Sequence, residues 1–238
     1  MNIKNDLNDI YALILCGGLG TRLRSEIGET QKVMALVDGH PFLDFNVELL
    51  RKQGVERIIL CTGFQSTQVE DYYRGEKGSK IVFSSEKSPL GTGGAIKNAQ
   101  TLIQSHPIFV FNGDSFCQVD LSAVLDFHKK KKALATVVLS KVKDSRDYGR
   151  VVIDKDAQIV EFKEKKERGE GYVNAGIYCL DKDIFKVMPK ETKFSIERDC
   201  FPQWIGKKLY GFIVDQEFFD MGTPERYGKI REGLKKAV

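Results

Sequence analysis

The chain lacks any apolar run that approaches the roughly 20 residues needed to cross a bilayer, and its first nine residues lack the apolar core of a signal peptide. We therefore expect a cytoplasmic protein without a membrane partner. Only three histidines are present, with no His-Glu-x-x-His helix, and the five cysteines form no Cys-x-x-Cys pair. Zinc chemistry is therefore disfavoured, and the cysteines are expected to be buried free thiols in a reducing compartment.

The chain also lacks a strong excess of either charge. Its 37 Lys and Arg residues against 33 Asp and Glu residues give a net charge of +4. This excess is too small to indicate nucleic-acid binding, although it suits small anionic substrates. A hydrophobic fraction of 42% and a charged fraction of 29% are typical of a folded soluble protein. The length of 238 residues suits one large α/β domain or two small ones.

A glycine loop follows the first apolar run of the chain. Residues 12–15 are all apolar, as in a buried parallel strand, and Gly17, Gly18 and Gly20 follow. Glycines allow positive φ and a close approach of the backbone to a ligand. Arg22, Arg24 and Lys32 then add three cations near exposed backbone N–H groups, which favours a triphosphate site.

Three other readings of this loop compete with the triphosphate site. Gly20-Thr21-Arg22 lacks the Gly-Lys-Ser/Thr of a Walker loop, which excludes an ordinary P-loop. The dinucleotide fingerprint matches in part, but Leu23 stands where its third glycine belongs. A tight βα turn with solvated arginines is the structural alternative.

Apolar patterning predicts strands that alternate with helices over the first half of the chain. Strands are expected at residues 12–15, 34–37, 57–62, 81–83 and 108–112, and helices at 41–53, 66–73, 93–102 and 121–132. This order indicates an α/β fold whose mostly parallel sheet is flanked by helices and binds ligands at the strand carboxyl ends. From residue 135 the pattern becomes β-rich, with strands expected at 135–139, 150–153, 158–162 and 172–180, and a last helix begins at Thr223-Pro224. We expect one domain over residues 1–238, with a nucleotide-binding part at about 1–134 and a β-rich sugar-phosphate-binding part at about 135–238.

Two aspartates stand in similar settings far apart in the sequence. Asp114 ends the apolar strand Phe109-Val-Phe-Asn-Gly-Asp114, and Asp220 follows Phe218 and Phe219 beside a glycine. A hard divalent cation that bridges phosphates requires such carboxylates. Each aspartate alone could be a turn or cap residue, but the pair together with the glycine loop favours Mg²⁺.

Five motifs carry a resemblance to a known family over nearly the whole chain. They are GGLGTRL (17–23), LGTGGA (90–95), NGD (112–114), NAG (174–176) and DMGTP (220–224). Their order and spacing resemble the sugar-1-phosphate nucleotidyltransferases, also called nucleoside-diphosphate-sugar pyrophosphorylases. Within that family, TRLRS (21–25), PLGTGGAI (89–96) and the absence of a C-terminal β-helix domain are most similar to the D-glycero-D-manno-heptose 1-phosphate guanylyltransferases.

The resemblance implies a Rossmann-like fold and a single displacement at phosphorus. The phosphate of a sugar 1-phosphate attacks the α-phosphorus of a nucleoside triphosphate and releases pyrophosphate, giving a nucleotide sugar for surface polysaccharide synthesis. Such chemistry consists mostly of positioning and charge neutralisation. The implied substrates are GTP and the sugar 1-phosphate, and the implied cofactor is Mg²⁺. The oligomeric state is left open, a homodimer included.

The resemblance also assigns site residues by motif position. The implied catalytic residues are Arg22, Lys32, Asp114 and Lys165, and the implied metal ligands are Asp114 and Asp220. The implied nucleotide-binding residues are Leu15, Gly17, Gly18, Gly20, Thr21, Arg22, Glu86, Gly91 and Thr92. The implied sugar-phosphate-binding residues are Asn112, Gly113, Tyr148, Gly149, Glu164, Lys165 and Asn174. One departure is Gln31, because the family usually has proline before the lysine, and its loss is expected to leave Lys32 more mobile.

Glu86 is expected to read the base, since the matching segment of related enzymes passes along the edge of the nucleobase. An ionised carboxylate only accepts hydrogen bonds, and guanine offers adjacent donors at N1 and N2. GTP is therefore the expected donor, with a solvated loop glutamate as the alternative reading. Rival functions for the whole chain are a mannose- or glucose-1-phosphate nucleotidyltransferase, a non-catalytic nucleotide-sugar-binding regulator and an NAD-dependent oxidoreductase.

Overall fold

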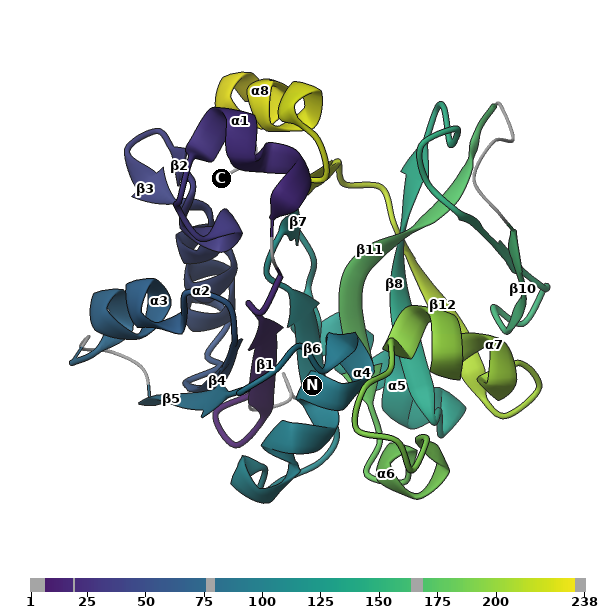
Figure 1. Cartoon of the computed structure of the whole chain (residues 1–238). Helices are drawn as coiled ribbons and strands as arrows, with labels where there is room; N and C mark the ends of the chain where they lie inside the picture. Colours follow the sequence, from purple (N-terminus) through teal and green to yellow (C-terminus); the bar gives the residue numbers. More distant parts are fainter. Residues whose placement is uncertain (1–6, 19, 76–79, 164–168, 234–238) are drawn as a thin grey trace.

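The computed structural model describes residues 7–18, 20–75, 80–163 and 169–233 of the chain (Figure 1). The strands are β1 (Tyr11–Leu15), β2 (Leu36–Val37), β3 (His40–Pro41), β4 (Arg57–Thr62), β5 (Lys80–Ser85), β6 (Ile108–Asn112), β7 (Ser115–Cys117), β8 (Ala135–Val142), β9 (Arg150–Ile153), β10 (Ile159–Lys163), β11 (Gly171–Leu180), β12 (Leu209–Val214) and β13 (Phe218–Asp220). The α-helices are α1 (Arg24–Ile27), α2 (Phe42–Lys52), α3 (Ser66–Tyr73), α4 (Gly91–Asn98), α5 (Leu121–Lys131), α6 (Ile184–Val187), α7 (Phe201–Trp204) and α8 (Pro224–Gly233). Shorter helical turns are η1 (Thr21–Leu23), η2 (Lys32–Met34), η3 (Ala99–Leu102) and the π-helical η4 (Ile196–Cys200).

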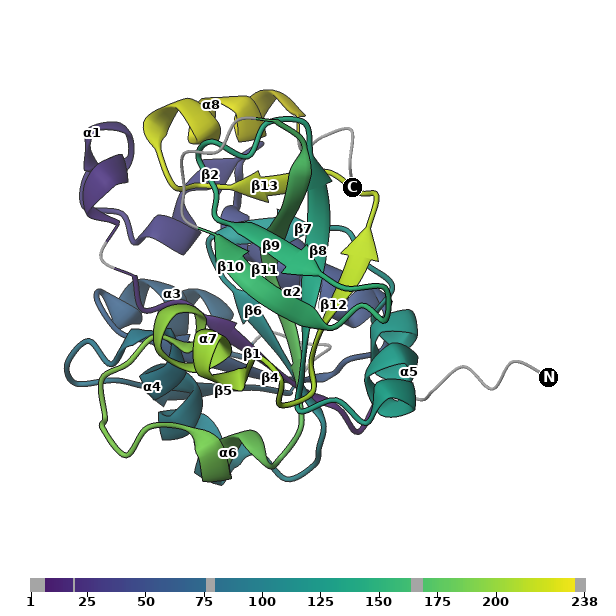
Figure 2. The ribbon, with the colours of Figure 1, turned by 90° about the vertical axis from the view of Figure 1, so that its right-hand side faces the viewer.

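A mixed sheet organises the fold, in the order β10-β9-β11-β6-β1-β4-β5, with β8 also paired to β11 and β12 paired to β8. β1 lies between β4 and β6 and is parallel to both, so the carboxyl ends of these three strands meet at one edge. β11 joins antiparallel to β6 and connects this part to β8, β9 and β10, which face the viewer in Figure 2. This confirms the expected mixed, mostly parallel sheet flanked by helices.

Both faces of β1 are buried, which explains its continuous apolar sequence. Ala12 and Ile14 point into a core that also contains residues of α2, α3 and α5. Leu13 points into a second core with residues of α4, α7 and the strands β8 and β11. Because successive side chains of a strand point to opposite faces, a strand covered on both faces needs apolar residues at every position.

Several predicted boundaries differ from the structure. The predicted strand at 34–37 contains the turn η2 and only two strand residues in β2, and the helix expected from residue 93 begins at Gly91. Strand β12 was not predicted. The last helix does begin at Pro224, and Tyr227 at its inner face donates a hydrogen bond to the carbonyl of Leu36 in β2 (2.6 Å).

All five cysteines are buried and form no disulfide, as predicted. Burial raises the pKa of Cys61 and of Cys117 to about 12, and it raises the pKa of Cys16, beside the glycine loop, well above its usual value. These thiols are protonated at neutral pH, so they are poor nucleophiles. In the described ranges, no helix is both long and apolar enough to cross a bilayer.

Candidate functional site

Two adjoining cavities lie at the carboxyl ends of β1 and β6. The first, of about 360 Å³, is lined by Leu15, Gly17, Gly18, Gln31, Lys32, Val33, Glu86, Pro89, Gly91, Thr92, Ala95, Asn112 and Asp114. The second, of about 270 Å³, is lined by Gly18, Gly20, Thr21, Arg22, Leu23, Lys32, Asp114, Met221 and Gly222. We call them the base cavity and the phosphate cavity, after the parts of the nucleotide that their residues are expected, from the sequence, to bind. They share Gly18, Lys32 and Asp114, so these residues stand at the junction.

An ion pair stands at this junction. The Nζ atom of Lys32 lies 2.5 Å from Oδ2 of Asp114. The side chain of Lys32 is only 10% exposed, whereas that of Asp114 is 45% exposed and open to both cavities. A nearly buried ammonium group needs a close counter-charge, which Asp114 supplies. The pair therefore places one cation and one carboxylate at the junction of the two cavities.

The glycines of the first loop have different physical roles. Gly20 has φ of 60°, a region that favours glycine, whereas Gly17 and Gly18 do not have positive φ. A Cβ atom on Gly17 would lie 2.7 Å from Oε1 of Glu86, so a side chain there would collide with the glutamate. The expectation of positive φ is thus correct at Gly20 only, and Gly17 instead makes room for Glu86.

Glu86 reaches the base cavity from the end of β5. Its Oε2 atom accepts a hydrogen bond from the backbone N–H of Leu90 (3.2 Å), and its Oε1 atom stands close to Gly17 and Gly63. Partial burial raises the pKa of this carboxyl group, while the bond from Leu90 opposes that shift. The side chain is therefore an anchored acceptor in the cavity, unlike a solvated loop glutamate.

Gln31 holds the loop that carries Lys32. Its side chain is buried, donates through Nε2 to the carbonyl of Cys16, and accepts through Oε1 from the N–H of Val33 (2.7 Å). Its backbone N–H donates to Gln68 (2.8 Å), a bond that proline could not make. Its φ of −61° equals the value that proline would impose. These contacts argue against the expectation that the loss of proline loosens Lys32.

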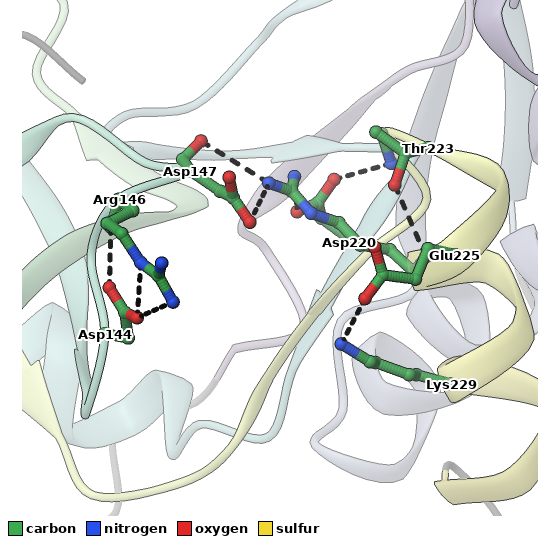
Figure 3. Close-up of polar contacts among 9 residues, drawn as sticks. Asp144, Arg146, Asp147, Asp220, Thr223, Glu225 and Lys229 are labelled. Atoms are coloured by element: carbon green, nitrogen blue, oxygen red, sulfur yellow. Dashed lines mark hydrogen bonds and ion pairs between the residues drawn. The ribbon is translucent and has the colours of Figure 1, made fainter. Parts of the chain in front are cut away.

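Asp220 lies beside Asp114 on a small antiparallel ladder. β13 pairs with β7, and the N–H of Met221 donates to the carbonyl of Asp114 (2.9 Å). The carboxylate of Asp220 accepts hydrogen bonds from the N–H of Gly222 (2.6 Å) and from Arg226 (2.6 Å). Figure 3 shows Asp147 on the far side of the same guanidinium, with an N–O distance of 3.5 Å. Asp220 is therefore held in place before any ligand binds.

The remaining predicted residues lie in different surroundings. Tyr148 lies next to Asp220, with the guanidinium of Arg226 over its ring at 4.3 Å, and burial raises its pKa well above the usual value. Asn174 lies on β11 and donates to the hydroxyl of Tyr178 (3.0 Å). Gly113 packs under the carbonyl of Leu15, where a Cβ atom would lie 2.7 Å from that oxygen, and Gly149 lies close to the carbonyl of Lys163. Glu164 and Lys165 lie outside the described residues.

Sequence reasoning missed Glu197, which contacts predicted residues of both groups. It lies on η4, and its carboxylate accepts hydrogen bonds from the predicted residues Thr92 (2.5 Å) and Asn112 (3.5 Å) and from Tyr178 (3.1 Å). A single glutamate in the stretch Ser195-Ile-Glu197 gives no pattern that distinguishes it from a surface residue. The only available signal is the polar Ser195 before it, which caps the turn by accepting from the N–H of Arg198 (3.3 Å).

The carboxylates of Asp114 and Asp220 are the candidate ligands for a divalent cation. In the described ranges, no group of three or more His, Cys, Asp or Glu side chains could hold a metal ion. Asp114 directly precedes β7, and Asp220 of β13 pairs with Ser115, so the backbones of the two aspartates are adjacent, although of the two only Asp114 lines both cavities. Mg²⁺ is commonly bound by one or two carboxylates, with substrate phosphates and water completing its shell. The residues present therefore fit a metal that binds together with a phosphate ligand.

Comparison with known proteins agrees with this arrangement. The family model described as "Nucleotidyl transferase" matches residues 11–237. The chain is 40% identical over 229 residues to the D-glycero-alpha-D-manno-heptose 1-phosphate guanylyltransferase of Aneurinibacillus thermoaerophilus, covering 95% of this chain and 99% of that protein. It is 41% identical to the enzyme of the same name from Campylobacter jejuni, covering 92% and 97%.

A solved structure agrees as well. HddC from Yersinia pseudotuberculosis complexed with GMP-PN superposes with a TM-score of 0.84 and 36% identity, covering 94% of this chain and 99% of that chain. The family expected from the five motifs is confirmed by these matches. The chain belongs to the nucleotidyl transferase family.

Proposed function

We propose that this protein transfers GMP from GTP onto D-glycero-D-manno-heptose 1-phosphate, releasing pyrophosphate and forming GDP-heptose for surface polysaccharide synthesis in the cytoplasm. The observation that carries the proposal is the pair of cavities joined at Lys32 and Asp114, one with an anchored acceptor and one with a glycine loop and cations. The match over nearly full length to two relatives named for this reaction supports the choice of substrates.

The reaction requires one bond to form and one to break at the α-phosphorus. A phosphate oxygen of the sugar 1-phosphate attacks, and the bond from the α-phosphorus to the oxygen that bridges to the β-phosphorus breaks. No protein nucleophile is required, so the residues contribute position and charge. In this scheme Arg22 stabilises the leaving pyrophosphate, Lys32 contacts the α-phosphate, and Lys165, from the family motif, holds the attacking phosphate.

Asp114 and Asp220 are the proposed ligands of Mg²⁺. The ion, when bound, neutralises charge on the reacting phosphates. A carboxylate offers about four lone-pair sites, so Asp220 can keep its bonds to Gly222 and Arg226 and still bind a cation. Asp114 can exchange its contact with Lys32 for the metal, because a bound triphosphate would then supply the counter-charge for the lysine.

The base cavity is the proposed guanine site. Glu86 is fixed by Leu90, and its ionised carboxylate can accept from N1–H and N2–H of guanine together. Uracil and thymine present one donor between two carbonyl oxygens, which a carboxylate repels. Leu15, Gly91 and Thr92 are among the other residues that line this cavity, and we assign them to the wall around the base.

The sugar-phosphate side is assigned to the second half of the chain. Tyr148, Gly149 and Asn174 come from the segments around β9 and β11, and Asn112 at the end of β6 shares with Asn174 a hydrogen bond to Tyr178. We propose that residues 1–134 bind mainly the nucleotide and residues 135–238 mainly the sugar phosphate, within a single domain.

The test is a screen by pyrophosphate release. Four nucleoside triphosphates are each combined with heptose, mannose and glucose 1-phosphates in the presence of Mg²⁺. We expect GTP with the heptose 1-phosphate to give the highest catalytic efficiency. A higher efficiency with another triphosphate would reject the guanine assignment, and no release with any pair would reject a transferase.

A further inference from the structure

The carboxylate of Glu197 is a half-buried junction that the assigned roles do not use. Its Oε2 atom accepts hydrogen bonds from the hydroxyls of Thr92 (2.5 Å) and Ser195 (2.7 Å). Its Oε1 atom accepts from the hydroxyl of Tyr178 (3.1 Å). A carboxylate is an acceptor only, so it fixes the direction in which each of these hydroxyls donates.

On the nucleotide side, this fixes Thr92. The hydroxyl of Thr92 accepts from the N–H of Ile196 (3.0 Å) and donates to Glu197, so both of its roles are set within the protein. Thr92 lies in the first turn of α4 and lines the base cavity. Glu197 therefore anchors the end of α4 that faces the proposed nucleotide.

On the sugar side, the same carboxylate orients Asn174 through Tyr178, and it orients Asn112 both through Tyr178 and by accepting directly from its Nδ2 atom (3.5 Å). The fully buried hydroxyl of Tyr178 donates to Glu197 and accepts from Nδ2 of Asn174 (3.0 Å) and, at a longer 3.4 Å, from Nδ2 of Asn112. With its Nδ2 atom turned toward Tyr178, Asn112 has a buried Oδ1 atom without a hydrogen-bond partner in the described part of the chain. Asn112 lines the cavity, and a buried acceptor without a partner is satisfied when a ligand hydroxyl donates to it.

The glycines of α4 seat the segment that carries Glu197. Gly93 and Gly94 donate backbone hydrogen bonds to the carbonyl of Phe194 (3.0 and 3.2 Å). A Cβ atom on Gly93 would overlap the ring of Phe194, and one on Gly94 would overlap the carbonyl of Thr192. These glycines therefore allow the close packing that brings Glu197 to Thr92.

We propose that Glu197 is a positioning residue that links the two substrate subsites. Its carboxylate holds Thr92 on the nucleotide side and, both directly and through Tyr178, orients Asn112 so that Oδ1 is the acceptor for a hydroxyl of the sugar phosphate. Removing the acceptor character of Glu197 therefore weakens the binding of both substrates, although Glu197 contacts neither of them. This inference rests on the proposed function for the identity of the two substrates.

The experiment compares three conservative variants by binding alone. Glu197→Gln keeps the shape of the side chain but replaces one acceptor oxygen by a donor, Thr92→Val removes the hydroxyl on the nucleotide side, and Tyr178→Phe removes the hydroxyl on the sugar side. Titration calorimetry measures the dissociation constants of a non-hydrolysable GTP analogue and of heptose 1-phosphate separately. Asp199→Asn is the matched control, because Asp199 lies on the same turn and accepts from the N–H of Ser195 (2.6 Å) without reaching either substrate side.

We expect a split between the two ligands. Tyr178→Phe raises the dissociation constant of the sugar phosphate about tenfold, which corresponds to about 1.4 kcal/mol. It leaves the dissociation constant of the GTP analogue within about twofold of the wild-type value. Thr92→Val raises the dissociation constant of the GTP analogue and leaves that of the sugar phosphate nearly unchanged. Glu197→Gln raises both dissociation constants. Asp199→Asn lowers the melting temperature without changing either constant more than about twofold.

Two results would overturn the proposal. In one, Glu197→Gln leaves both dissociation constants within about twofold of the wild type. In the other, Thr92→Val and Tyr178→Phe each weaken both ligands equally with a lowered melting temperature, which is the signature of a structural role alone. If pyrophosphate release shows that the wild type prefers another substrate pair, the same variants are titrated with that pair, so failure of the proposed function does not decide this test.

Discussion

The Nζ atom of Lys32 lies 2.5 Å from Oδ2 of Asp114, and this ion pair joins residues 82 positions apart at the junction of two cavities. Each partner has a separate role in the proposed reaction, because the lysine contacts the α-phosphate and the aspartate binds the metal. Substrate binding therefore has to separate the two side chains, and the charges that replace each partner come from the triphosphate and from Mg²⁺.

The first prediction concerns the two aspartates. Asp114→Asn and Asp220→Asn should each lower kcat by about a hundredfold or more, the scale of losing a main electrostatic stabiliser. The measurement is pyrophosphate release against Mg²⁺ concentration. Asp215→Asn, an exposed aspartate between β12 and β13, is the matched control and should keep normal rates. A near-normal rate at saturating Mg²⁺ for either main variant would show that its aspartate is not a metal ligand.

The second prediction separates the leaving group from the attacking group. Arg22 lines the phosphate cavity, where charge develops on the departing pyrophosphate. Arg22→Ala should therefore lower kcat more than it raises the KM of the sugar phosphate. Lys165→Ala should mainly raise the KM of the sugar phosphate. Steady-state kinetics with both substrates varied gives the comparison, and a change confined to the sugar-phosphate KM in Arg22→Ala contradicts the role of Arg22.

The third prediction uses the pKa of Glu86. Burial raises this pKa, so the carboxylate becomes protonated at a higher pH than an ordinary glutamate does. Guanine binding needs the ionised form, and the KM for GTP should therefore rise as the pH falls through the raised pKa. Glu86→Gln should weaken GTP use by about 1 to 3 kcal/mol and remove this pH dependence. An unchanged ratio of GTP to UTP efficiencies in the variant would exclude Glu86 as the base reader.

The fourth prediction concerns Gln31. Gln31→Leu removes the side-chain bonds to Cys16 and Val33, whereas Gln31→Pro keeps the backbone φ and also loses the bond to Gln68. Both variants should lower kcat about tenfold or more through misplacement of Lys32, because small displacements of positioned groups are costly in phosphoryl transfer. Full activity in Gln31→Pro would show that φ alone places the lysine.

The glycine loop and its strand could be predicted because their signals are local. Residues 12–15 and 108–111 are apolar at every position since both faces of β1 and β6 are covered, and the loops that follow the two strands then meet at one edge. Strand β12 was missed because Gly211 interrupts its pattern. That glycine makes room for the side chains of Leu139 and Ile153, which is a tertiary reason that the local sequence does not show.

The contacts that assemble the site could not be predicted in the same way. Glu197 lies on a five-residue π-helical turn with no periodic pattern, and the packing of Phe194 against Gly93 fixes its place. The anchoring of Gln31 depends on Cys16 and Gln68, which lie 15 and 37 positions away. Such residues acquire their roles from the fold.

The most direct test of the central claim is identification of the products by mass spectrometry and phosphorus NMR. Purified protein is incubated with GTP, D-glycero-D-manno-heptose 1-phosphate and Mg²⁺, with Asp114→Asn as the blank. The account predicts GDP-heptose and pyrophosphate in equal amounts with the wild type and almost none with the variant. Hydrolysis of GTP without a nucleotide sugar, or a nucleotide sugar that forms equally well in the variant, would contradict it.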